Sequence, residues 1–451
     1  MLRSHRSVVI RRWQDAEAPG SDDCCKRLEA GVPRLGFTQV EVRMLALVGA
    51  PLIDGTGSDP VNATVVIDDE RIAAVGGEVS VPDAAEQVDL TGLWLLPGLI
   101  DLHSHIGLVE VERSGRMSAA LWAAHIFANA ELALASGYTT TREVAGVDGG
   151  VVQAVRAGLV NGPRIFPSGP LLCQSGGHGD LGSPWEMACG AHGRGEQFIG
   201  LGAISVVVDG PDEVRRAVRH AFHRGATQIK MCITGGVVSL ADKLSDTQFS
   251  VPEMRAAVEE AKARGTYVTA HTHNNAAIMM GLEAGIECFE HCTHLDAATA
   301  RAMADAGAAM VPTLSVVHVM ATRAEAWGVP PEAIPRLGQV GENMAASIRL
   351  AREHGVLIGS GTDLLGPNQR DKGLELALRA EVEDPMTAIT AATRDSATVM
   401  RQLHEFGTVE TGKLADIIAV DFDPLADPKF FADPDRVRVV IKGGRVCKDT
   451  R

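Results

Sequence analysis

Short runs of alternating apolar and polar residues lie near both ends of the chain, separated by Gly, Asp and Pro breaks. They cover residues 44–48, 63–67 and 71–75 at one end, and 416–420 and 437–444 at the other. Such alternation over four to eight residues predicts half-buried strands. Because both ends share this pattern, we expect one small β-sandwich built from residues 44–96 and 407–451.

Between these ends, apolar strand-like runs alternate with helical stretches. Helices are predicted over 117–136, 151–159 and 212–224, and another begins at the capping box formed by Ser250 and Glu253. The expected strands are 96–105, 138–144, 164–169, 227–233, 267–273, 288–292, 309–313 and 357–362. Eight strands in this rhythm predict an α/β fold, in which a TIM-like (β/α)8 barrel over residues 97–406 is inserted into the sandwich.

Residues 1–43 mix arginines with acidic residues and lack a long apolar core. We expect a polar, disordered leader and hypothesise that the natural protein starts at Met44, where the strand pattern begins. Two predicted loops, 173–209 and 234–248, are longer than a connection requires. Both follow barrel strands, so we place them at the C-terminal mouth, where barrel enzymes build their sites.

Composition narrows the class of function. The net charge is −15 and no basic cluster occurs along the chain, so a nucleic-acid-binding groove is not expected. No apolar run approaches the length of a membrane span. The eight cysteines include no C-x-x-C pair, which favours reduced thiols in a cytoplasmic enzyme.

Residue types that bind metals lie at the C-terminal ends of five predicted strands. In chain order they are His103 and His105, Lys230, His271, His291, and Asp363. Since these strand ends converge in a barrel, we expect the side chains to share one mouth. Imidazole, carboxylate and lysine groups then form a plausible site for one or two divalent metals.

The first of these strands also carries an acidic residue. Alternate side chains of an extended strand share a face, so Asp101, His103 and His105 are expected to point the same way. Taken singly, the candidate ligands also have plain structural explanations. Lys230 could be an ion-pair partner, and Asp363 could cap a helix. Taken together, five coincidental polar strand ends are less plausible than a metal site.

Several motifs carry a resemblance to a known family. They are Pro97-Gly98-Leu99-Ile100-Asp101-Leu102-His103-Ser104-His105, Gly176-Gly177-His178-Gly179-Asp180, Ile229-Lys230 with Thr234-Gly235-Gly236-Val237, Ala270-His271-Thr272-His273, Glu290-His291, Gly361-Thr362-Asp363 and Gly412-Lys413-Leu414-Ala415-Asp416-Ile417. From about Met44 onward the chain resembles the amidohydrolase superfamily. More narrowly it is similar to the imidazolonepropionase-like branch, which includes dipeptidases, ochratoxin-hydrolysing enzymes, and phenylurea and thiocarbamate hydrolases.

The resemblance implies a binuclear metal centre, with zinc the first expectation and cobalt, manganese or iron as alternatives. One ion is expected on His103, His105 and Asp363. The second is expected on His271 and His291. The resemblance also implies a homo-oligomer.

Lys230 is implied to be carboxylated by CO2, giving N6-carboxylysine that bridges both ions. A lysine desolvated beside cations loses its proton readily and can then react as an amine. If Lys230 stays unmodified, we expect a mononuclear site. In the implied mechanism, a metal-bound water loses a proton to Asp363 and attacks the substrate as hydroxide. Asp363 then passes the proton to the departing nitrogen.

Substrate contacts are less determined by the sequence. His273 and His178 are predicted to bind substrate, although a rim histidine and simple loop geometry explain them equally well. Apolar residues of the long loops favour a small amide, urea or carbamate with a scissile C–N bond. A dipeptidase that releases a C-terminal residue is the first alternative. A catalytically inactive scaffold is the second, and the complete set of ligand positions argues against it.

Overall fold

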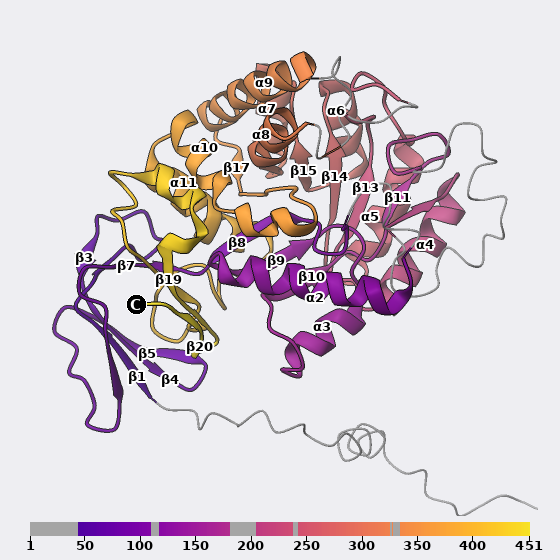
Figure 1. Ribbon diagram of the computed structural model, residues 1–451. Helices are drawn as coiled ribbons and strands as arrows, with labels where there is room; N and C mark the ends of the chain where they lie inside the picture. The colour runs from indigo at the N-terminus through magenta and orange to yellow at the C-terminus, as the bar shows by residue number, and fades with distance from the viewer. Residues whose placement is uncertain (1–43, 110–116, 181–203, 238–241, 325–326, 328–333) are drawn as a thin grey trace, which may run out of the picture. The chain divides into compact units, whose positions relative to one another are not determined.

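The computed structural model describes residues 44–109, 117–180, 204–237, 242–324, 327 and 334–451 (Figure 1). The leader predicted over residues 1–43 lies outside the described residues, and so do parts of both long loops. In the described part, no helix combines the length and the apolar character that crossing a bilayer requires.

Parallel strands form the centre of this α/β fold, in two sheets. The smaller sheet has the order β10-β9-β8 and the larger has the order β12-β11-β13-β14-β15-β16-β17. Every pairing within them is parallel. Their bounds are β8 Leu99–Ser104, β9 Tyr138–Glu143, β10 Arg164–Pro167, β11 Leu171–Cys173, β12 Ser205–Val207, β13 Ile229–Cys232, β14 Val268–Thr272, β15 Cys288–His291, β16 Ala309–Val311 and β17 Leu357–Ile358.

All eight predicted strands have a counterpart among these elements, and the α/β class is confirmed. The first long loop was expected to contain no strand, which is wrong. Strand β12 lies inside it, and β11 ends at its first residue, Cys173. The two short strands pair with each other and extend the larger sheet beside β13.

The two parallel sheets are not one continuous ladder, but backbone hydrogen bonds connect them at both ends. Leu102 N donates to Ser360 O at 2.8 Å, which joins β8 to the segment after β17. At the other edge, Thr227 N donates to Pro167 O at 2.8 Å, which joins the end of β10 to the approach to β13.

Helices lie outside the parallel strands (Figure 1). The α5 helix begins with the predicted capping box, in which Ser250 N donates to Glu253 Oε2 at 2.7 Å. The α4 helix buries an apolar stripe that includes Val214 and Val218, as its periodicity predicts. The helices are α2 Ala119–Ala135, α3 Gly149–Arg156, α4 Pro211–His223, α5 Val251–Lys262, α6 Asn275–Ala284, α7 Ala297–Asp305, α8 Leu314–Thr322, α9 Ile334–Glu353, α10 Leu374–Val382, α11 Pro385–Thr390 and α12 Ser396–Val399.

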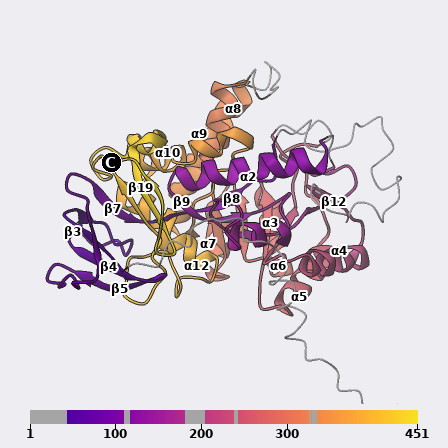
Figure 2. The same cartoon turned by 60° about the horizontal axis from the view of Figure 1, so that its bottom comes forward.

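Of two further sheets, the first is built from N-terminal strands alone and the second combines strands from both ends of the described chain. One has the order β5-β4-β1-β6 and the other the order β20-β19-β18-β7-β2-β3. Residues of both sheets belong to one apolar cluster, and the N- and C-terminal strands lie side by side in both views (Figures 1 and 2). Their bounds are β1 Leu45–Val48, β2 Pro51–Leu52, β3 Val61–Asn62, β4 Thr64–Asp68, β5 Arg71–Gly76, β6 Glu86–Asp89, β7 Trp94–Pro97, β18 Ile417–Val420, β19 Val437–Lys442 and β20 Arg445–Asp449.

The single strand predicted over residues 96–105 is wrong, because the chain divides it in two at Gly98. Strand β7 pairs with β18 in the six-stranded sheet, whereas β8 pairs with β9 in the parallel sheet. A Cβ at Gly98 would lie 2.1 Å from Thr139 Oγ1, so the close approach of the two segments requires glycine.

The strict alternation predicted along β8 is also wrong. Asp101 pairs with Thr141 and Ser104 with Glu143, so three steps on β8 match two on β9. This one-residue bulge reorients the side chains that follow it. Asp101 and Ser104 therefore both contact Lys372, instead of pointing to opposite faces.

Candidate metal centre

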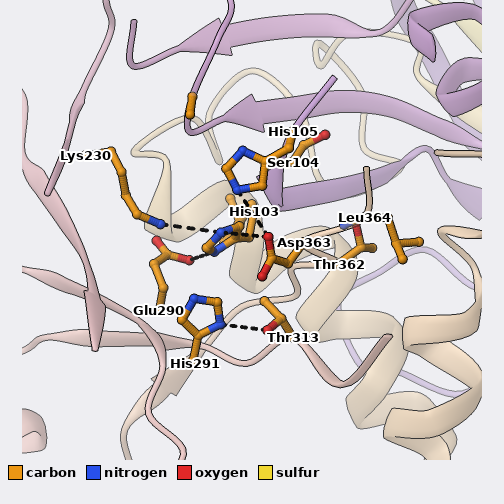
Figure 3. A network of polar contacts seen from close by, with 12 residues as sticks. His103, Ser104, His105, Lys230, Glu290, His291, Thr313, Thr362, Asp363 and Leu364 are labelled. Carbon is orange, nitrogen blue, oxygen red and sulfur yellow. Dashed lines mark hydrogen bonds and ion pairs between the residues drawn. The ribbon is translucent and has the colours of Figure 1, made fainter. Parts of the chain in front are cut away.

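The six predicted metal ligands lie together at or near the C-terminal ends of the parallel strands. Figure 3 shows all of them except His271. Lys230 Nζ lies 3.4 Å from His103 Nε2. The carboxylate of Asp363 lies between two imidazoles, with Oδ1 at 3.5 Å from His103 Nε2 and 3.1 Å from His105 Nε2. These contacts join the ends of β8 and β13 with the segment that follows β17.

The remaining two ligands extend this cluster along β14 and β15. The ring centroid of His291 lies 4.8 Å from that of His103 and 4.7 Å from that of His271. His273, predicted to bind substrate, stacks on His291 with centroids 5.0 Å apart. The strand ends thus converge as the barrel pattern predicts.

Fixed hydrogen bonds select one nitrogen of each ring. His103 donates through Nδ1 to Glu290 Oε2 at 2.8 Å, and His271 donates through Nε2 to Gly235 O at 3.2 Å. A carboxylate and a carbonyl only accept, so these partners set the tautomers of the neutral rings. His291 Nδ1 is paired with Thr313 Oγ1 at 2.8 Å. The ring atoms left for a metal are Nε2 of His103 and His291, and Nδ1 of His271.

Burial keeps these groups in the forms that ligands need. It lowers the pKa of His103, and it lowers the pKa of His271 and His291 further, with neighbouring imidazoles adding to the effect. The rings are therefore neutral, as metal ligands must be. Burial also lowers the pKa of Lys230, which favours the reactive free amine.

The pKa of Asp363 is shifted so that its charged form is favoured, unlike those of the histidines and Lys230. Burial opposes its ionisation, but the imidazoles of His103 and His105 outweigh that effect and hold its pKa below the usual range. The side chain is therefore a carboxylate at neutral pH, able to bind a cation or to accept a proton.

The donor atoms fit a divalent metal. Ligand atoms of His103, His291 and Asp363 all lie within 4.8 Å of one another, and so do those of His271, His273 and His291. Mixed imidazole and carboxylate donors at such spacing suit zinc and similar ions. His273, which was predicted to contact substrate and not a metal, is thus close enough to share a metal.

His178 approaches this cluster from the glycine-rich segment after β11. Its ring stacks on His271, with centroids 4.2 Å apart and planes 16° from parallel. His178 Nδ1 is buried and has no hydrogen-bond partner among the described residues. A Cβ at Gly236 would lie 2.1 Å from His178 Cε1, so a glycine at 236 leaves the ring its space. Its predicted contact with substrate stays a prediction.

Two ligand positions adopt a backbone conformation that non-glycine residues rarely use. His291 has φ 64° and Asp363 has φ 57°. Such conformations cost about 1–3 kcal/mol each and persist where surrounding contacts hold them, often at functional sites. Here Asp363 N donates to His103 O at 2.7 Å, which holds the strained residue against β8.

Sequence reasoning missed the buried pair that supports His103. Glu290 Oε1 accepts from Arg142 Nη2 at 2.5 Å, while its Oε2 accepts from His103. Arg142 also donates to Leu102 O at 2.6 Å. The available signal was charge inside buried strands: Arg142 and Glu143 in β9, and Glu290 in β15. Charged residues are rarely fully buried unless they are paired.

Parallel β/α topology with a His, Lys and Asp cluster at the C-terminal strand ends is the arrangement of an amidohydrolase-type protein. Residues 94–447 match the model of the amidohydrolase family, and the chain belongs to that family. This confirms the superfamily expected from the motifs.

Relatives include proteins of the expected branch. The chain is 33% identical over 426 residues to an ochratoxinase from Aspergillus niger, covering 90% of this chain and 87% of that protein. It resembles a prolidase solved in complex with N-methylphosphonate-L-proline, with a TM-score of 0.84 and 35% identity over 90% of this chain and 100% of that one. A Xaa-Pro dipeptidase solved with bound methionine gives a TM-score of 0.79 and 30% identity, with 90% and 100% coverage.

Proposed function

We propose that this protein is a metal-dependent hydrolase that cleaves a C–N bond of a small molecule. The observation that carries the proposal is the convergence of four imidazoles, a lysine and a carboxylate from β8, β13, β14, β15 and the segment after β17. Membership of the amidohydrolase family supports the reaction class.

The ligands we propose for one divalent ion are His103, His105 and Asp363. Those for a second ion are His271 and His291, with carboxylated Lys230 between the two. Bound zinc, cobalt, manganese or iron would polarise a substrate carbonyl and lower the pKa of a water from about 15.7 towards 7.

Asp363 is the residue that we propose moves the proton. Its carboxylate accepts a proton from the attacking water and releases it to the departing nitrogen. Its position in the cluster supports this role, because its ionised carboxylate is available there as a proton acceptor. We propose that His178 and His273 bind substrate beside this group.

The leading substrates are amides, ureas or carbamates of small molecules, a choice supported by the ochratoxinase relative. A dipeptidase that releases a C-terminal residue is the second candidate, supported by the prolidase and the Xaa-Pro dipeptidase. A dipeptidase needs a positive group to bind the carboxylate of its substrate. Among the described residues, Arg323 directly after α8 is bound by Asp371 at 2.7 Å and by Asn368 at 2.8 Å, so its charge is already paired.

We further propose that the two parallel sheets close into a (β/α)8 barrel and that the other two sheets form a sandwich. Backbone hydrogen bonds at both sheet edges support the barrel, and the shared apolar cluster supports the sandwich. A homo-oligomer, a cytoplasmic location and the domain boundaries stay predictions. The described cysteines, Cys173, Cys232, Cys288, Cys292 and Cys447, are free thiols.

A substrate panel with one variant tests the proposal. Protein reconstituted with zinc, cobalt or manganese is assayed on Xaa-Pro and other dipeptides, N-aryl amides, phenylureas and carbamates. Asp363→Asn should lower kcat by about 10²–10⁴-fold, since it removes the proton acceptor, and should retain part of the bound metal.

The matched control is Asp371→Asn, which changes a carboxylate paired with Arg323 outside the cluster. It should keep nearly full activity. Full activity in Asp363→Asn would refute the assigned role. A purified chain that binds no divalent metal and hydrolyses nothing in the panel would instead favour the inactive scaffold.

A further inference from the structure

A second buried charged cluster lies beside the metal ligands without belonging to them. Lys372 and Asp101 are both 0% exposed and form an ion pair. Lys372 Nζ also donates to Ser104 Oγ at 2.9 Å, and Tyr138 donates its hydroxyl hydrogen to Lys372 O at 2.9 Å. Lys372 is thus held from both its backbone and its ammonium group.

Asp101 connects the two chain segments that carry the first set of ligands. Its Oδ1 accepts from His103 N at 3.0 Å and from Thr362 N at 3.0 Å, and its Oδ2 accepts from Thr362 Oγ1 at 2.7 Å. His103 is itself a proposed ligand, and Thr362 directly precedes Asp363. One carboxylate therefore fixes both backbones by which these ligands are attached.

The bulge in β8 explains why such a connection is needed. An extra residue between Asp101 and Ser104 disrupts the regular ladder with β9 where the ligand histidines begin. Lys372 contacts the residues on either side of the extra position, Asp101 and Ser104. The ion pair thus replaces part of the support that the interrupted ladder no longer provides.

We propose that Lys372 and Asp101 form a positioning pair that holds His103 and Asp363 at the separation a metal requires. This inference rests on the proposed metal-dependent function. Lys372 touches no ligand side chain; it acts through Asp101, whose buried charge needs a counter-ion to remain an acceptor for two backbone groups. Supporting residues of this kind typically change metal affinity by about 10–100-fold when they are removed.

Cobalt binding to the full-length metal-free protein tests this proposal. Lys372→Met should raise the Kd for Co²⁺ by about 10–100-fold and shift the visible absorption of bound cobalt, which reports ligand geometry. The control is Arg379→Met: Arg379 is also buried, pairs with Glu383 and donates to Gly359 O at 2.9 Å. It should destabilise the protein but leave cobalt affinity within about 3-fold and the spectrum unchanged, because its contact with the segment after β17 is at Gly359, four residues before Asp363, and not at Thr362 or His103.

A milder variant applies if Lys372→Met does not fold. Thr362→Val keeps the side-chain shape and removes only the hydroxyl bonded to Asp101. It should weaken cobalt binding less than Lys372→Met and shift the spectrum in the same direction. Unchanged affinity and spectrum in the folded variants would overturn the positioning role. Failure of the unsubstituted protein to bind cobalt would instead overturn the metal-dependent function itself.

Discussion

Removing the buried charge of Glu290 is expected to destabilise the protein and to weaken its metal centre together. Glu290 and Arg142 are both 0% exposed, and Glu290 accepts from Arg142, from His103 and from Thr269. Burial alone would raise the pKa of Glu290, but Arg142 and His103 outweigh it and hold that pKa far below its usual range. Glu290→Gln replaces one acceptor oxygen with a donor, so it cannot satisfy both Arg142 and His103.

The expected loss of stability follows from the buried charge that each substitution leaves unpaired. A buried guanidinium that loses its counter-ion costs about 3–5 kcal/mol. Loss of the anchor on His103 Nδ1 is expected to cost a further 10-fold to about 100-fold in metal affinity. Arg142→Met leaves Glu290 as the uncompensated charge, so it should destabilise the fold by a similar amount. The double variant leaves no unpaired charge, and its loss should be smaller than the sum of the two single losses by about 1–3 kcal/mol.

Urea unfolding of the metal-free protein measures these free energies for the wild type, both single variants and the double variant. The control cycle uses Arg215→Met and Glu259→Gln, an exposed pair at 2.9 Å that should contribute about 0–1 kcal/mol. Single losses below about 1 kcal/mol, or strictly additive losses, would refute the account of Glu290 and Arg142 as a desolvated ion pair.

Two further outcomes follow from local geometry and burial. A Cβ at Gly361 would lie 2.6 Å from His103 Cβ, so Gly361→Ala should displace that ligand and weaken cobalt binding. The control is Gly338→Ala on α9, where an added Cβ would meet nothing within 4 Å and should stabilise the protein by about 0.5–1 kcal/mol. Equal cobalt binding in both variants would contradict this reasoning. Burial raises the pKa of Glu375, a residue of α10 whose carboxyl group accepts from Leu314 N and Ser315 N at the start of α8, to about 7. The folded protein then holds a proton that the unfolded chain releases, so stability is fully present below about pH 4.5 and is lost as pH rises through 7, by about 3 kcal/mol in total. Glu375→Gln should remove that part of the slope in unfolding measured at pH 5 and pH 8, and an unchanged slope would show that Glu375 is not the titrating group.

The position of the candidate site could be predicted from local pattern because one rule of topology applies to each strand separately. His103, Lys230, His271 and His291 each lie within or at the end of a predicted barrel strand, and parallel strands place their C-terminal ends together. That inference requires only the order and direction of the strands. It does not require knowing which residues contact one another or how far apart they are. The division at Gly98 was missed because the apolar run continues across it, and only the contact with Thr139 requires the glycine.

The pairs that support the site could not be predicted in the same way. Asp101 and Lys372 are 271 residues apart, and Arg142 and Glu290 are 148 apart. A charged residue in a buried strand indicates that a partner exists but not which one. The bulge in β8 is equally hidden, because it depends on register with β9 and not on the composition of either strand.

These supporting pairs suggest why so much charge is buried around one cluster. A buried ion pair adds little net stability, since desolvation offsets most of the attraction, but breaking one is costly. Arg142 with Glu290 holds the ring of His103, while Lys372 with Asp101 holds its backbone and that of Thr362. The two pairs constrain different degrees of freedom of the same ligand. If these pairs provide geometry and not stability, substitutions in either pair should change the cobalt spectrum strongly relative to the free energy of unfolding that they cost. Arg379→Met should instead cost free energy of unfolding and leave the cobalt spectrum unchanged.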